Sequence, residues 1–81
     1  MSSENKKIFV IGCGRWGSFI AWYLDRIGHR VSLYGRKTSK NMQEFLQSRQ
    51  NEYVTLPDSI ELTMSYDGVK EADIIVISIS S

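Results

Sequence analysis

The chain has 81 residues, of which 42% are hydrophobic and 23% are charged, a composition typical of one small globular domain. Ten basic and nine acidic side chains give a net charge of +1, which argues against the strongly basic surface of a nucleic-acid-binding or membrane-surface protein. The single cysteine excludes an internal disulfide, and no apolar run is long enough to predict a membrane span. We therefore expect a cytoplasmic protein that binds no nucleic acid and no membrane.

The first two elements are predicted to be a strand and a helix. Residues 8–11, Ile-Phe-Val-Ile, form an uninterrupted apolar run that ends at a glycine, which indicates a strand covered on both faces. From Trp16 to Ile27, apolar residues recur at helical spacing and predict a helix of about three turns with one continuous apolar stripe. Gly28 is placed to cap the end of that helix, and His29, which follows it, is expected to contact the last carbonyls.

Three more strands are expected after the first helix. Residues 31–34 predict the second strand, residues 39–50 a less apolar helix, and residues 60–64 a weakly alternating third strand. A short turn at 67–72 leads to residues 74–77, the most β-prone stretch of the chain. Because crossovers between parallel strands are right-handed almost without exception, we expect an α/β fold. It should be a half-Rossmann parallel sheet of about four strands, ordered 3-2-1-4, with helices on its faces.

The predicted fourth strand ends close to residue 81. Such an end leaves a strand edge and apolar surface uncovered, so we expect residues 1–81 to be a fragment of a longer protein. If the fragment folds alone, a homodimer could form through this exposed cut face.

Residues 12–17, with the sequence GCGRWG, lie between the first predicted strand and the first predicted helix. In this context a G-x-G-x-x-G loop is typical of dinucleotide binding. Gly12 would permit the tight turn, Gly14 would let the backbone approach a diphosphate, and Gly17 would let the helix pack closely on the strand. A turn with a purely structural role is the alternative.

The two interior residues of the loop, Arg15 and Trp16, have two interpretations. Their backbone N–H groups would face the phosphates at the helix N-terminus, with the Arg15 side chain as a further cation. Alternatively, Trp16 only begins the apolar stripe and Arg15 is solvated. Cys13 is expected to be a small filler within the turn.

The end of the second predicted strand indicates which dinucleotide is bound. An NAD-binding domain usually has Asp or Glu there, which accepts a hydrogen bond from the ribose 2′-hydroxyl. Here Gly35 occupies that position and Arg36 and Lys37 follow, so a 2′-phosphate would meet positive charge instead of a carboxylate. This favours NADP as the cofactor, with NAD as the alternative. A solvated helix start would also explain these residues, although basic residues do not favour that position.

The chain offers no catalytic constellation. His29 lies at the far end of the first predicted helix from the glycine loop, and no acid–base pair, nucleophile–base pair or metal-ligand spacing is present. We therefore expect neither catalytic nor metal-binding residues within these 81 residues.

Four stretches, namely IFVIGCGRWGS, GHRVSLYGR, LPDSIELT and EADIIVISISS, resemble the N-terminal domain of bacterial NAD(P)-dependent glycerol-3-phosphate dehydrogenase. That family is an oxidoreductase family that reversibly reduces dihydroxyacetone phosphate to glycerol 3-phosphate by hydride transfer, supplying phospholipid synthesis. The resemblance implies that residues 1–81 are an N-terminal NAD(P)-binding Rossmann domain fragment. The substrate domain, which binds the small phosphorylated triose, and the catalytic lysine would lie beyond it.

The resemblance also assigns residues to the cofactor. Arg15 and Trp16 match the loop positions that contact it, Arg36 and Lys37 match positions near the adenosine ribose, and Tyr53 matches an aromatic residue of the connector. Two alternatives to this family are another NAD(P)-dependent dehydrogenase of the same superfamily and a non-catalytic nucleotide-sensing Rossmann module.

Overall fold

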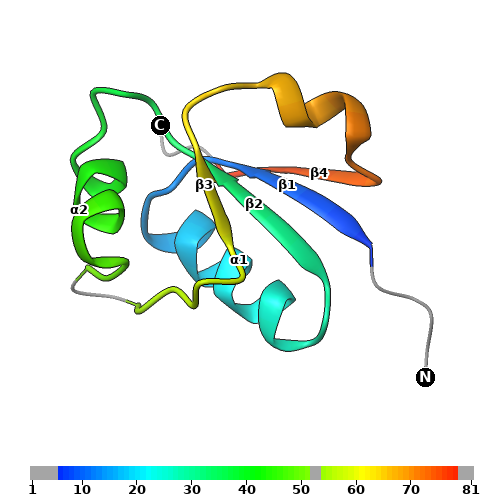
Figure 1. Cartoon of the computed structure of the whole chain (residues 1–81), viewed down its shortest axis with the longest axis horizontal. Helices are drawn as coiled ribbons and strands as arrows, with labels where there is room; N and C mark the ends of the chain where they lie inside the picture. The colour runs from blue at the N-terminus through cyan, green and yellow to red at the C-terminus, as the bar shows by residue number, and fades with distance from the viewer. Residues whose placement is uncertain (1–5, 52–53, 79–81) are drawn as a thin grey trace.

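The computed structural model describes residues 6–51 and 54–78, which form seven elements (Figure 1). They are, in chain order, β1 (Lys7–Ile11), α1 (Arg15–Arg26), β2 (Arg30–Tyr34), α2 (Lys40–Ser48), β3 (Glu61–Thr63), the 3₁₀ helix η1 (Asp67–Glu71) and β4 (Ile74–Ile77). All strand pairs are parallel and the order is β3-β2-β1-β4. The predicted α/β class and the 3-2-1-4 strand order are confirmed.

The two α-helices cover one face of the sheet, and η1 lies against the other (Figure 1). Alternate residues of each strand point to opposite faces, so Ile8 and Val10 of β1 face the helices whereas Phe9 faces η1. Phe9 is buried beneath η1, where its ring would contact any side chain placed at Gly68. The main core lies between the sheet and the helices, and its fully buried side chains include Val10, Leu33, Met42, Phe45, Leu56 and Ile60.

Helix α1 packs on the sheet through small residues. Its buried positions are Gly17, Ser18 and Ala21, whereas Trp16 is 67% exposed and Tyr23 is 51% exposed. The apolar stripe of the sequence therefore meets the core only in part, through residues such as Leu24. Small side chains let the helix approach the sheet closely, and several of the larger apolar side chains remain exposed on its outer flank.

A residue in the left-handed conformation follows the end of each α-helix. Gly28 follows α1 with φ 106°, and the backbone N–H of His29 donates to the Leu24 carbonyl oxygen (3.1 Å). The expectation for the His29 side chain is wrong, because its imidazole Nδ1 instead accepts from the Lys6 backbone N–H (3.0 Å). The residue that caps the C-terminus of α2 is Arg49, which has φ 60°.

Strand β4 forms one edge of the sheet and carries exposed aliphatic side chains. Ile74 and Ile75 are each 44% exposed and Ile77 is 66% exposed. The apolar edge expected from the sequence is therefore present in the described residues. Pairing of two copies through it stays a prediction, which sedimentation of the chain at several concentrations would test.

Candidate functional site

A cleft of about 650 Å³ lies at the carboxyl ends of the strands. Its walls come from residues 11–17 after β1, from residues 34–36 at the end of β2, from the first turns of α2, and from Tyr66 and Ser78. The chain moves outward from β1 to β2 and β3 and then crosses to β4 on the other side of β1. Ligands of open α/β sheets bind at such a switch in strand order, outside the carboxyl ends of the strands.

The three glycines of the loop differ in backbone conformation and in the space around them. Gly12 has φ 111°, a left-handed conformation that favours glycine. A Cβ at Gly17 would clash with the Gly12 carbonyl oxygen and would lie 2.8 Å from its carbonyl carbon. Gly14 differs from both, because it is extended (φ −73°, ψ −164°) and a Cβ there would meet no atom within 4 Å. The space next to Gly14 is open for a ligand to approach the backbone.

The N-terminus of α1 opens onto this space. The N-cap residue is Gly14, which has no side chain to accept a hydrogen bond from the first turn, and the first turn holds no acidic residue. The first intrahelical bond runs from the Ser18 N–H to the Gly14 carbonyl oxygen (3.0 Å). An uncapped helix N-terminus presents N–H donors and the positive end of the helix dipole, which together favour an anion.

The N-terminus of α2 reaches the same cleft but is already capped. The Ser39 hydroxyl accepts from the Met42 backbone N–H (3.3 Å) and lies 3.2 Å from the Cys13 sulfur. This contrast distinguishes the two helix N-termini at the cleft, since only α1 lacks a side-chain cap. The anion-binding character of the cleft is therefore concentrated at the glycine loop.

The structure brings most of the residues predicted for the site together. Those that line the cleft are Gly12, Gly14, Arg15, Trp16, Gly17 and Arg36. Lys37 is exposed and does not line it, whereas Lys40, in the first turn of α2, does. The Lys37 carbonyl oxygen instead accepts from the Gln43 side-chain amide (2.8 Å). Tyr53 lies outside the described residues.

Gly35 is buried directly after the end of β2, and its neighbours leave little room for a Cβ. A Cβ at this position would lie 2.5 Å from the Cys13 sulfur and 2.8 Å from the Met42 methyl carbon. The absence of a carboxylate at this position therefore has a steric cause in addition to the electrostatic one predicted from the sequence. Cys13 is 4% exposed, and its contact with this glycine position agrees with the expected filler role.

Sequence reasoning missed an aromatic pair at the cleft. Tyr34 and Tyr66 both line it, and their rings stack with centroids 4.2 Å apart and planes inclined by 19°. A hydrogen bond with Tyr66 raises the pKa of the Tyr34 phenol above its usual value, and desolvation adds to the increase. Tyr66 stands in a polar connector without periodicity, so its sequence context held no signal for this contact.

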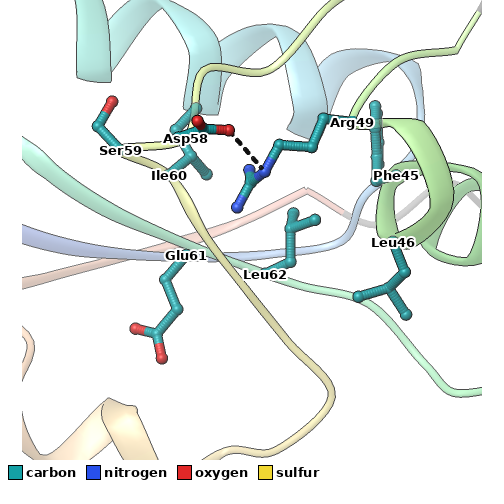
Figure 2. Close-up of a pocket in the computed structure, with 8 residues that line it drawn as sticks. All are labelled: Phe45, Leu46, Arg49, Asp58, Ser59, Ile60, Glu61 and Leu62. Carbon is teal, nitrogen blue, oxygen red and sulfur yellow. Dashed lines mark ion pairs between the residues drawn. The ribbon is translucent and has the colours of Figure 1, made fainter.

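A second, smaller hollow of about 470 Å³ lies between the end of α2 and β3 (Figure 2). The Arg49 Nε lies 3.4 Å from an Asp58 carboxylate oxygen, and its Nη1 donates to the Pro57 carbonyl oxygen (3.0 Å). These contacts connect the end of α2 to the segment before β3, and the Asp58 partner is fully exposed. We interpret this hollow as structural, because its cation is already engaged by the protein.

Two other features are absent from the described residues. Over residues 6–51 and 54–78, no three His, Cys, Asp or Glu side chains group closely enough to hold a metal ion. In the same residues, no helix has both the length and the apolar character needed to cross a membrane.

A parallel β-α-β sheet with a glycine loop leading into an uncapped helix N-terminus defines the nucleotide-binding half of a Rossmann-type domain. The family described as NAD-dependent glycerol-3-phosphate dehydrogenase N-terminus matches residues 7–81. The chain belongs to this family.

Curated relatives agree with this assignment. Glycerol-3-phosphate dehydrogenase [NAD(P)+] from Thermoanaerobacter sp. is 34% identical over 79 residues, which are 93% of this chain and 24% of that protein. The enzyme of the same name from Orientia tsutsugamushi is 37% identical over 75 residues, covering 88% of this chain and 22% of that protein. The chain thus spans about a quarter of the length of these relatives.

A solved structure supports the fold. The crystal structure of glycerol-3-phosphate dehydrogenase from Coxiella burnetii superposes with a TM-score of 0.73 at 22% identity. The match covers 90% of this chain and 24% of that one.

Proposed function

We propose that this chain binds a nicotinamide dinucleotide at the glycine loop, as the N-terminal cofactor domain of a glycerol-3-phosphate dehydrogenase. The observation that carries the proposal is the uncapped N-terminus of α1 beside the open space at Gly14. The diphosphate oxygens would accept hydrogen bonds from the first-turn N–H groups. The helix dipole would stabilise the negative charge there by about 0.3–1 kcal/mol.

The bound nicotinamide would supply the hydride for the proposed reduction of dihydroxyacetone phosphate. We assign to the residues of this chain the role of holding and orienting the cofactor. We assign the triose phosphate site and the catalytic groups to a separate substrate domain of the longer protein, in keeping with the share of the relatives that this chain spans.

The proposal includes a preference for NADP over NAD. Arg36 lines the cleft directly after the end of β2, where the adenosine ribose of a bound dinucleotide is recognised. Its guanidinium can form paired, charge-assisted hydrogen bonds with a 2′-phosphate. Lys40 and Glu44 of α2 also line the cleft with opposite charges, so the preference rests on Arg36.

Arg36→Asp is expected to weaken NADPH binding by at least roughly tenfold and NADH binding by less than about threefold, because only NADPH carries the 2′-phosphate. Calorimetric titration with both cofactors measures the two losses. Lys37→Asp is the matched control, since it makes the same change of charge one residue away and outside the cleft. Equal losses for NADPH and NADH in Arg36→Asp would contradict the 2′-phosphate assignment.

A further inference from the structure

Tyr66 is an exposed aromatic residue in an unusual position. It comes from the connection between β3 and η1, lines the cleft, and is 55% exposed. Its backbone is held in place, because its carbonyl oxygen accepts from the Val69 N–H at the start of η1 (3.0 Å). Ligand clefts are lined by aromatic side chains that present a flat apolar face, so a half-exposed ring that lines a cleft is suited to contact a ligand.

Tyr34 provides a rigid backing for this ring. Its ring stacks on that of Tyr66 with centroids 4.2 Å apart, and it also lies next to Phe9, with ring centroids 6.3 Å apart. Phe9 is itself buried beneath η1. One face of the Tyr66 ring is therefore covered by protein, and a flat ligand in the cleft can stack only on the other face.

The strand order indicates which part of a bound dinucleotide would lie next to Tyr34 and Tyr66. Strands β2 and β3 lie on one side of β1, and β4 lies on the other. Tyr34 ends β2 and Tyr66 follows β3, so both stand on the side of the glycine loop where the end of β2 reads the adenosine ribose. The nicotinamide half must extend in the opposite direction, toward Ser78 after β4.

We propose that the stacked pair is the platform for the adenine ring, with Tyr66 in contact with the base and Tyr34 as its positioning residue. This inference rests on the proposed dinucleotide function. Stacking between a base and an aromatic side chain tolerates any base, so the pair adds affinity for the adenine half without distinguishing NADPH from NADH. That discrimination stays with Arg36.

Calorimetric titration of the full-length protein with NADPH, NADH and ADP-ribose tests the assignment. ADP-ribose contains the adenine, the adenosine ribose and the diphosphate but no nicotinamide. Tyr66→Ala is expected to weaken all three by a similar factor of about tenfold, whereas Tyr66→Phe keeps the aromatic face and stays within about twofold of the wild type. Tyr66→Leu keeps apolar bulk without an aromatic ring, so it is expected to lose as much as Tyr66→Ala and provides the test if the alanine variant fails to fold.

Tyr23→Ala is the matched control, because Tyr23 is 51% exposed on α1 and does not line the cleft. It is expected to bind all three ligands like the wild type. Unchanged binding by folded Tyr66→Leu, or a loss confined to NADPH and NADH that spares ADP-ribose, would overturn the adenine assignment while leaving the proposed function intact. If the wild-type full-length protein binds none of the three ligands, the proposed function fails together with this inference.

Discussion

Replacing Gly17 with alanine is expected to destabilise the fold by about 3 kcal/mol or more, which is a large share of the stability of a domain of this size. The added Cβ would clash with the Gly12 carbonyl oxygen. That atom cannot shift cheaply, because Gly12 has φ 111° and its N–H donates to the Tyr34 carbonyl oxygen (3.0 Å). The helix would have to move away from the sheet, and the contacts of its small buried residues would be lost.

Chemical denaturation monitored by circular dichroism measures this loss. Gly14→Ala is the control within the same loop, because its backbone is extended and its Cβ would meet nothing within 4 Å. Its cost should be limited to the poorer N-cap, about 1 kcal/mol or less. A Gly17→Ala variant as stable as the wild type would show that the close approach of α1 to the loop is not required.

Gly35→Asp is expected to destabilise the chain by about 3 kcal/mol, and it should not produce an NAD-specific domain. An acidic residue at this position would ordinarily accept from the ribose 2′-hydroxyl. Here its Cβ would lie 2.5 Å from the Cys13 sulfur and 2.8 Å from the Met42 methyl carbon. Because Gly35 also lines the cleft, the cost comes mainly from displacing the Cys13 and Met42 side chains and not from burying the charge.

Gly35→Ala separates the steric part of this cost from the charge. Thermal unfolding of the two variants should show that alanine already causes much of the loss. Adding Cys13→Ala to Gly35→Ala removes the nearest clashing atom and should restore part of the stability. A Gly35→Asp variant that melts like the wild type and binds NADH more tightly would restore a purely electrostatic role for this glycine.

The strand order could be predicted because strong local signals and a handedness rule left few alternatives. The apolar run of β1, the β-prone run of β4 and the helical spacing of α1 each indicated one element, and right-handed crossovers then ordered the strands. The packed face of α1 could be predicted only at Gly17, through the glycine motif. Hydrophobic periodicity identifies an apolar face, but close packing on the sheet also selects small residues such as Ser18 and Ala21, which no motif indicated.

The site was predictable where a motif determines backbone geometry and less so where side-chain direction matters. The glycine loop and Arg36 line one cleft, as their positions after β1 and β2 require. Lys37 follows directly in sequence but does not reach the cleft, because successive residues of the chain point in different directions. Tyr66 joins the site only through the path of the β3–η1 connection, which its sequence does not encode as a pattern.

Binding of a diphosphate against the backbone at Gly14 is tested most directly by titrating the wild-type chain and Gly14→Ala with NADPH and NADH. The wild type should bind, and the variant should bind both cofactors at least roughly tenfold more weakly while its free energy of unfolding stays within about 1 kcal/mol. The reason is that a methyl group would fill the open space beside the N-terminus of α1 without disturbing the protein. Equal affinities of the wild type and Gly14→Ala for both cofactors would contradict a diphosphate site at this loop.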